Sequence, residues 1–196
     1  LMKIIVISSP SPVSNEAFIF QKLIESGVDY IHIRKPGDAL SIVRNLLINL
    51  PSVFHSKIKL HYYIELIKEF PLVGFHHSGA SSFDRSIEKK QSKSFHSFEE
   101  VEQDTFSYEY FFLSPVFSSI SKVNYQPNYS IDEFQSFLES YPNKSCIALG
   151  GVSEANVKQL KEIGFSGVAL LGTLWAEKDS DIIIEKFVRI YRLIKN

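Results

Sequence analysis

Short apolar runs alternate along the chain with longer segments in which apolar residues recur at helical spacing. The short runs are rich in Val, Ile, Leu and Phe, as is typical of strands in a parallel sheet that is buried on both faces. The alternation predicts an α/β protein whose helices cover the sheet. The eight predicted strands cover residues 3–7, 30–33, 58–61, 72–75, 94–96, 110–113, 145–149 and 167–171. The predicted helices cover residues 15–26, 39–50, 63–70, 82–90, 98–103, 131–141, 154–163 and 180–195.

Eight successive β-α units favour closure of the sheet into a single (β/α)8 TIM barrel. No Asn-Gly or Asp-Gly turn, which would indicate a hairpin, occurs anywhere in the chain. An open doubly wound sheet is the alternative that the pattern leaves. With 196 residues, 44% of them hydrophobic, we expect residues 1–196 to form one barrel domain around one substantial core. An active site is then expected at the carboxyl ends of the strands.

Composition narrows the classes of partner. The 21 basic and 22 acidic side chains give a formal net charge of -1, and they form no dense basic run of the kind that binds nucleic acid or an anionic membrane. No apolar stretch approaches the roughly 18 residues of a membrane span, and no signal peptide is recognisable. The single cysteine, Cys146, lies in an apolar run and is interpreted as a buried strand residue. These features predict a cytoplasmic protein.

Glycines follow the last two predicted strands. Gly150 and Gly151 come after the seventh strand, and Gly172 and Thr173 come after the eighth. In TIM barrels, backbone N–H groups at this place commonly bind phosphate. The alternative is that the glycines only form tight turns, but their occurrence on two adjacent strands favours the phosphate site.

Cationic side chains end the second strand. In the run His32-Ile33-Arg34-Lys35, His32 and Arg34 fall on one face of the strand, and Lys35 begins the loop. A guanidinium can bind a phosphate with two parallel hydrogen bonds, so these residues are candidates for an anion site. Surface ion pairs are the alternative.

The long segment after the sixth strand supplies further anion-binding groups. It reads SPVFSSISK and includes Ser119, Ser121 and Lys122. Long irregular loops in compact domains are usually functional. Several histidines also lie at or near strand ends, and His61, His76 and His77 are candidates for a metal site, although no His-x-x-x-His pair or carboxylate cluster accompanies them.

Five motifs, in this order and spacing, identify a resemblance to the family of thiamine phosphate synthases and TenI-type thiazole tautomerases. They are YIHIRK, SFHSFEE, YFFLSPVFSSISK, IALGGVSEAN and GVALLGTLW, and they extend over nearly the whole chain. The resemblance implies a barrel that joins a hydroxymethylpyrimidine diphosphate to a thiazole phosphate with release of pyrophosphate. It also suggests a homo-oligomer that binds small phosphorylated molecules.

The same resemblance implies roles for individual residues. Those expected to act in catalysis are Arg34, Lys122 and His96. Those expected to bind the two substrates are His32, Lys35, Ser94, Ser119, Ser121, Gly150, Gly151, Gly172 and Thr173. A dissociating diphosphate needs positive charge and hydrogen-bond donors where its negative charge develops, which agrees with these residue types.

This chain departs from the family pattern at two places, and these departures leave more than one function open. The synthases hold Mg²⁺ with aspartates after the third and fourth strands, where this chain has Tyr62 and Ser81 or Ser82. The tautomerases are expected to use a histidine where this chain has Ser114. Three readings follow: a synthase that uses Mg²⁺, a tautomerase that needs no cofactor, and a non-catalytic barrel that binds thiazole phosphate.

Overall fold

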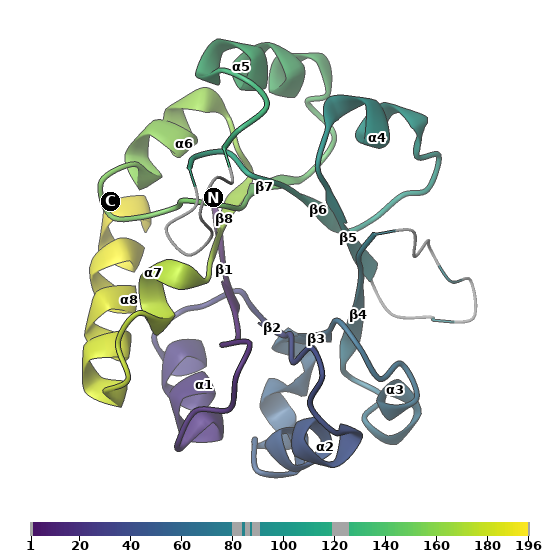
Figure 1. Cartoon of the computed structure of the whole chain (residues 1–196), viewed down its shortest axis with the longest axis vertical. Helices are drawn as coiled ribbons and strands as arrows, with labels where there is room; N and C mark the ends of the chain where they lie inside the picture. Colours follow the sequence, from purple (N-terminus) through teal and green to yellow (C-terminus); the bar gives the residue numbers. More distant parts are fainter. Residues whose placement is uncertain (1, 80–83, 85–86, 88–90, 119–125, 196) are drawn as a thin grey trace.

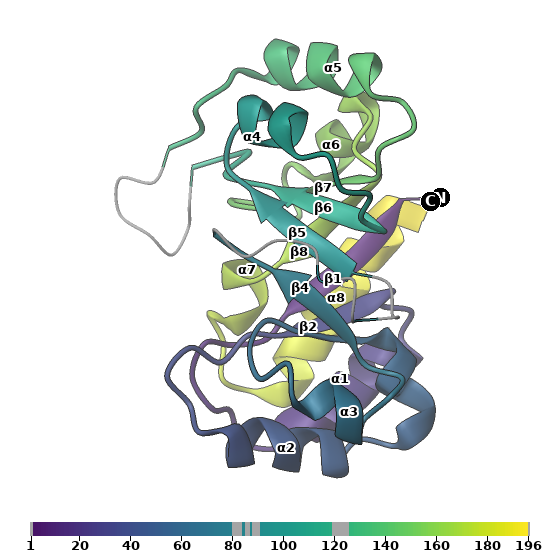
Figure 2. The ribbon, with the colours of Figure 1, turned by 90° about the vertical axis from the view of Figure 1, so that its right-hand side faces the viewer.

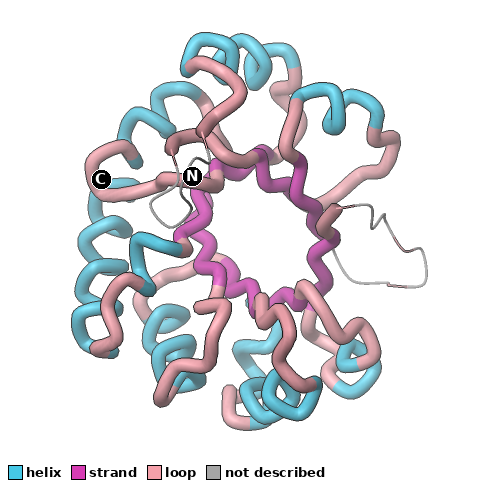
Figure 3. The backbone as a smooth tube through the Cα atoms, viewed as in Figure 1, coloured by secondary structure: helices cyan, strands magenta, loops and turns pink. Residues whose placement is uncertain are grey.

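A computed structural model describes residues 2–79, 84, 87, 91–118 and 126–195. Eight parallel strands form a closed barrel in chain order, and β8 pairs with β1 to complete it. Figure 1 and Figure 3 show the ring of strands inside a ring of helices. The predicted TIM barrel is confirmed, and the open sheet is excluded. The strands are β1 (Lys3–Ile7), β2 (Tyr30–Ile33), β3 (Ile58–Leu60), β4 (Gly74–His77), β5 (Gln91–Phe95), β6 (Tyr110–Leu113), β7 (Cys146–Ala148) and β8 (Gly167–Leu170).

The helices of the described residues lie outside the strands. They are α1 (Glu16–Glu25), α2 (Leu40–Ile48), the 3-10 helix η1 (Ser52–Lys57), α3 (Leu66–Glu69), α4 (Phe98–Gln103), α5 (Ile131–Ser140), α6 (Val157–Ile163), α7 (Gly172–Trp175) and α8 (Ser180–Lys195). Local signals explain several of their ends. Ser130 and Glu133 form a capping box at the start of α5. The helix α6 ends where Gly164 adopts a left-handed conformation.

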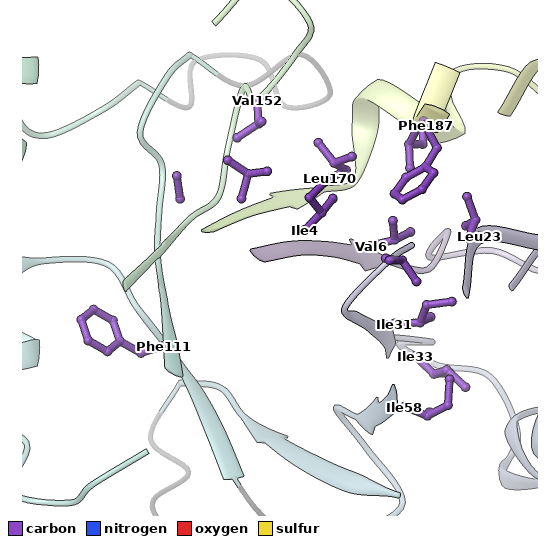
Figure 4. Packing of buried hydrophobic residues seen from close by; sticks show 14 of the residues in the cluster. Ile4, Val6, Leu23, Ile31, Ile33, Ile58, Phe111, Val152, Leu170 and Phe187 are labelled. Atoms are coloured by element: carbon purple, nitrogen blue, oxygen red, sulfur yellow. The ribbon is translucent and has the colours of Figure 1, made fainter. Parts of the chain in front are cut away.

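The main hydrophobic core lies between the barrel and the helices, because alternate strand residues point outward. Val6 of β1, Leu23 of α1 and Phe187 of α8 are fully buried there. Figure 4 shows these side chains gathered in the space between strand and helices. Cys146 is buried in the same layer, and burial raises the pKa of its thiol well above the ordinary value. It is the buried strand residue that the sequence predicts.

Residues 2 and 195, the first and last that the structure describes, lie at the same end of the barrel (Figure 2). The ammonium group of Lys195 in α8 donates a hydrogen bond of 2.9 Å to the carbonyl of Met2. This is the end of the barrel where the strands begin, so the carboxyl ends of the strands open on the opposite side. No helix in the described part of the chain combines the length and apolar character needed to span a membrane.

Several elements differ from the prediction, among them β5, which begins at Gln91, three residues before its predicted start. The strand β4 begins at Gly74 and includes His76 and His77, two residues later than predicted, so its two histidines alternate across the sheet. The short helices η1 and α7 were not predicted. The predicted helix over residues 82–90 falls largely outside the described residues.

Candidate active site

A pocket of about 250 Å³ opens at the carboxyl ends of the strands. Its walls combine apolar side chains from β1 and from the ends of β6, β7 and β8 with polar groups from the remaining strands. Seven residues that the sequence assigns to the site line this pocket: Arg34, Ser94, His96, Gly150, Gly151, Gly172 and Thr173. The structure therefore brings together positions that are far apart in the sequence, at the end of the barrel where active sites are expected.

The two glycine turns form one wall of the pocket. Gly151 has a φ of +66°, and a Cβ atom there would lie 2.5 Å from the carbonyl oxygen of Ser118, so only glycine fits this close approach. Gly172 begins α7, where the first N–H groups of a helix have no intrahelical acceptor and can bind an anion. The hydroxyl of Thr173 donates to the carbonyl of Val152, which ties one turn to the other. Thr173 thus contributes mainly its backbone to the pocket.

Arg34 lines the same pocket and directly follows β2. Its backbone N–H donates to the hydroxyl of Ser8 at 2.8 Å, which fixes the strand end. Among the described residues, its guanidinium has no hydrogen-bond or ion-pair partner. An unpaired guanidinium that lines a pocket is suited to bind a phosphate or diphosphate.

Lys35 does not line this pocket. It is 1% exposed, and its ammonium group donates to the carbonyls of Ser9 and Ser11, each at 2.9 Å, and to the carboxylate of Glu16 at 2.8 Å. Burial raises the pKa of Glu16, and the adjacent ammonium opposes this increase. All three N–H donors of Lys35 are used, so the structure places this side chain as an anchor for the loop between β1 and α1, not as a neighbour of Arg34 in an anion site.

His32 lies inside the barrel beneath the pocket, fully buried, rather than on the pocket wall. Its Nδ1 is 2.9 Å from Nε2 of His61, and its Nε2 is 2.7 Å from the hydroxyl of Tyr110. The His61 ring stacks on that of His76, with ring centroids 4.2 Å apart. One ligand nitrogen from each of these three histidines lies within 4.8 Å of the others. We call His32, His61 and His76 the histidine cluster.

Serine hydroxyls hold one member of the histidine cluster in place. Nδ1 of His76 is 2.8 Å from the hydroxyl of Ser92, and Nε2 is 2.8 Å from that of Ser94. Ser94 and His61 both line the pocket, so the cluster reaches the pocket directly through His61 and indirectly through the hydroxyl that contacts His76. The predicted substrate contact Ser94 therefore shares its hydroxyl with a buried imidazole.

The electrostatic environment keeps the histidine cluster neutral. Burial, followed by the positive charge of Arg34, lowers the pKa of His61 to about 3. Burial also lowers the pKa of His32 and His76 well below the ordinary value of 6.5, and neighbouring imidazoles and Lys59 act in the same direction. At neutral pH these three rings are uncharged, and each has one nitrogen lone pair.

The other two histidines of the predicted site lie apart from the cluster. His77 points to the outer side of β4, where its Nε2 is 2.6 Å from the side-chain oxygen of Gln91. His96 is exposed at the pocket, and its Nδ1 is 3.2 Å from both the carbonyl and the hydroxyl oxygen of Ser114. The structure thus groups His32, and not His77, with the metal candidates His61 and His76.

The predicted diphosphate contacts Ser119, Ser121 and Lys122 lie outside the described residues. Of the described residues that line the pocket, none carries a carboxylate. Glu65 and Asp84 instead line a neighbouring cavity, which His61 and Tyr62 also border. Because Mg²⁺ prefers oxygen ligands, usually including carboxylates, the described pocket wall does not fit a magnesium site.

Sequence reasoning missed the histidine cluster because it ended the fourth strand too early. With β4 placed at Gly74–His77, His76 follows Gly74 on the inner face, and its ring centroid lies 4.9 Å from that of His32. The signal available in the sequence was the position of histidines on three consecutive strands, namely β2, the end of β3, and β4.

The fold and the pocket define a TIM barrel whose mouth gathers groups suited to anion binding. A family model described as thiamine monophosphate synthase matches residues 90–174. A thiamine-phosphate synthase from Actinobacillus succinogenes is 23% identical over 195 residues, which cover 86% of this chain and 84% of that protein. One from Vibrio campbellii is 28% identical over 92 residues, 47% of this chain and 45% of that protein.

Solved structures agree with these matches. A thiamine phosphate pyrophosphorylase from Bacteroides thetaiotaomicron superposes with a TM-score of 0.82 at 28% identity, over 100% of this chain and 98% of that one. A second, from Pyrococcus furiosus, has the same fold with a TM-score of 0.80 at 14% identity, over 99% and 96% of the two chains. These matches confirm the resemblance to thiamine phosphate synthases and their relatives that the sequence motifs indicate. This homology supports a role in thiamine biosynthesis.

Proposed function

We propose that the chain is a transferase of the thiamine phosphate synthase type, which joins a hydroxymethylpyrimidine diphosphate to a thiazole phosphate. The observation that carries this proposal is one pocket that is lined both by the backbone turns at Gly151 and Gly172 and by Arg34, whose guanidinium has no partner among the described residues. Two separate sets of anion-binding groups suit a reaction between two phosphorylated molecules.

In the proposed reaction, one set of anion-binding groups holds the leaving diphosphate and the other holds the thiazole phosphate. The bond between the pyrimidine methylene carbon and the diphosphate oxygen breaks, and the diphosphate leaves with the electron pair. The lone pair of the thiazole nitrogen then forms the new C–N bond. Arg34 stabilises the negative charge that develops on the leaving group, because a fixed cation in a pocket needs no reorganisation as the charge appears. The glycine turns hold the thiazole phosphate so that its nitrogen lies close to the carbon.

Further residues that the sequence assigns to the site have the following proposed roles. His96 and Ser94 lie at the end of β5 and can donate hydrogen bonds to diphosphate oxygens. We assign Ser119, Ser121 and Lys122 to the same leaving group on the strength of the family resemblance alone. His32 acts from below the pocket through its hydrogen bond to His61 and does not contact a substrate.

Magnesium is the cofactor expected of a synthase, but the described pocket wall has no carboxylate to hold it. Tyr62 and a serine stand where the family has aspartates. We therefore derive no step of the reaction through Mg²⁺. The proposal rests on Arg34 and the backbone donors.

The test is an assay of the purified chain with both substrates, with and without added Mg²⁺, that measures thiamine phosphate and pyrophosphate together. We expect equal amounts of the two products. Arg34→Gln is expected to lower kcat/KM by about 100-fold, because one charge-stabilising donor is removed. Arg44→Gln is the matched control, since Arg44 is an exposed residue of α2 that pairs with Glu69 and is expected to leave the rate unchanged.

Absence of both products at high enzyme concentration would overturn the proposal. Conversion of a thiazole carboxylate phosphate to its aromatic isomer in the same preparation would identify a tautomerase instead. Binding of thiazole phosphate without either reaction would identify a non-catalytic barrel.

A further inference from the structure

The histidine cluster has the composition of a transition-metal site. Its members come from three consecutive strands: His32 from β2, His61 from the end of β3 and His76 from β4. Three imidazole nitrogens are a common donor set for Zn²⁺, and imidazole also suits Co²⁺, Ni²⁺ and Cu²⁺. All three side chains are buried; His32 and His76 lie within strands, and His61 directly follows β3, where its backbone N–H donates to the carbonyl of Ile33 at 3.1 Å.

The distances within the cluster suit such an ion. Zinc–nitrogen bonds of about 2.0–2.1 Å at tetrahedral angles place two ligand nitrogens about 3.4 Å apart. In the structure, Nδ1 of His32 and Nε2 of His61 are 2.9 Å apart, and all three ligand atoms lie within 4.8 Å of one another. The required separation falls between these values, so small rotations of the side chains would bring the nitrogens to the bonding distance.

The groups around the cluster would orient the ligands. If Nδ1 of His32 binds an ion, its Nε2–H can donate to the hydroxyl of Tyr110 at 2.7 Å. Whichever nitrogen of His76 binds, the other faces the hydroxyl of Ser92 or of Ser94 at 2.8 Å. Hydrogen bonds from the second ring nitrogen are what fixes a metal-binding histidine in most sites.

Access comes from the pocket. His61 is 7% exposed and lines both the main pocket and the neighbouring cavity. Two nearby cations would repel a bound metal ion. The positive charge of Arg34 is felt at His61, and that of Lys59 at His32 and His76. The ammonium group of Lys59, however, pairs with the carboxylate of Glu109 at 2.9 Å, which offsets part of its charge.

We propose that His32, His61 and His76 form a binding site for one divalent transition-metal ion, of the class of Zn²⁺ or Co²⁺, beneath the floor of the pocket. The site differs in ligands and in position from a magnesium site built of carboxylates. It does not rest on the proposed transferase activity.

The first experiment titrates the metal-free protein with Co²⁺ and records its visible absorption. We expect one Co²⁺ per chain with the intense bands of a four- or five-coordinate site, and their loss when Zn²⁺ is added. His32→Gln, His61→Gln and His76→Gln are each expected to weaken Co²⁺ binding at least tenfold. His77→Gln is the matched control, because His77 lies next to His76 on the same strand but points to the other side.

Two further measurements keep the result clear if a variant fails to fold. Saturating Zn²⁺ is expected to raise the Tm of the wild-type protein and of His77→Gln, because a ligand of the folded state stabilises it by mass action. Pulsed electron paramagnetic resonance of Cu²⁺ bound to the wild-type protein is expected to show coordinated imidazole nitrogens. The proposal is overturned if the wild-type protein gives no stoichiometric Co²⁺ spectrum, or if binding survives in folded variants of all three histidines. None of these readouts uses a substrate, so failure of the transferase assay leaves them unaffected.

Discussion

Apart from Lys3, whose ammonium group lies 5.4 Å from the ring centre of Tyr110, strands β1, β7 and β8 fill their side of the barrel interior with aliphatic side chains. Strands β2 to β5 fill the other side with the ring of Tyr30, imidazoles, hydroxyls and an ammonium group. The aliphatic half consists of Ile5, Ile7, Ile147 and Ala169, together with Leu149 and Leu171 at the strand ends. The polar half consists of His32, Lys59, His61, His76, Ser92 and Ser94. The rings of Tyr110 and Phe112 on β6 lie at the boundary between the halves.

The comparison shows how one barrel supplies two kinds of pocket wall. Above the aliphatic half, the tightly packed ends of β7 and β8 present backbone donors at Gly151 and Gly172. Above the polar half, β2 and β5 present side chains, among them Arg34 and Ser94. Buried polar groups need partners, and the polar half satisfies its own through the hydrogen bonds of the histidine cluster and the Lys59–Glu109 ion pair. The four predictions below test this division, in order of decreasing effect.

The largest effect is expected from breaking the ion pair at the base of the polar half. Lys59 is 2% exposed, and its ammonium group lies 2.9 Å from the carboxylate of Glu109 and 4.7 Å from the ring centre of Tyr110. Lys59→Met leaves a largely buried carboxylate without this cation, and we expect the free energy of unfolding to fall by about 3–5 kcal/mol. Urea denaturation at pH 7 measures this change.

The double variant Lys59→Met/Glu109→Gln is the control for that prediction. Removing both charges avoids the unpaired carboxylate, so the double variant is expected to recover part of the lost stability. A double variant less stable than Lys59→Met would contradict the role given to this pair.

Acid is expected to destabilise the protein through the histidine cluster. Burial lowers the pKa of His61 to about 3, and the pKa values of His32 and His76 also lie well below 6.5. In the unfolded chain these rings take up protons below about pH 6.5, and in the folded protein they do not. The unfolded state therefore binds more protons, so stability is fully present above pH 6.5 and is lost as the pH falls towards 3. For each ring, the free energy of unfolding is expected to fall by about 1 kcal/mol between pH 6.5 and 5.5.

Urea denaturation of the metal-free protein at several pH values measures this slope. Because carboxylates titrate mainly below this range, the imidazoles dominate it. His61→Gln removes one titrating group and is expected to reduce the slope by about a third of the cluster's contribution. Stability that does not change between pH 6.5 and 5.5 would show that the folded protein protonates these rings, contrary to the neutral cluster described above.

The sequence predicts the barrel because its strong signals are local and repeat eight times. Strands such as Lys3–Ile7 and Tyr110–Leu113 are continuous apolar runs, and their predicted bounds agree with the structure. The strand β4 was predicted wrongly because it is not such a run. Two of its four residues are histidines, one facing the polar interior, so a rule that seeks apolar residues ends the strand before it reaches them.

The site could be predicted where its chemistry lies in the backbone or at a strand end, and less well where it depends on packing. The glycine turns and Arg34 were found because the end of a strand can be read from the sequence. The environment of Lys35 could not be found, since its three acceptors lie in the loop after β1 and at the start of α1, 19 to 26 residues away along the chain. The histidine cluster needed the exact register of three strands.

A moderate effect is expected at the top of the aliphatic half. Gly151→Ala places a methyl group 2.5 Å from the carbonyl of Ser118, so the turn must move, and we expect a loss of about 2–3 kcal/mol together with weaker binding of thiazole phosphate. Gly164→Ala is the matched control. Gly164 also has a positive φ, of +104°, but nothing lies within 4 Å of its Cβ position, so we expect only about 1 kcal/mol. Equal losses in the two variants would show that backbone conformation, and not the close approach, requires glycine at 151.

The smallest effects are expected from variants that remove one heavy atom from a side chain in either half of the barrel interior. Ile147→Val removes a methyl group from the aliphatic half and is expected to cost about 1 kcal/mol, by the same amount at pH 7 and pH 5.5, because no titrating group changes its partner. Ser92→Ala removes one oxygen from the polar half and leaves Nδ1 of His76 without its hydroxyl partner. A buried nitrogen that loses its partner costs about 1–3 kcal/mol, and this cost should be smaller at pH 5.5 if the loosened ring can then take up a proton. Urea denaturation at both pH values measures all four changes. A pH-dependent loss in Ile147→Val, or a Ser92→Ala variant as stable as the wild-type protein, would show that the two halves do not differ in the way their chemistry indicates.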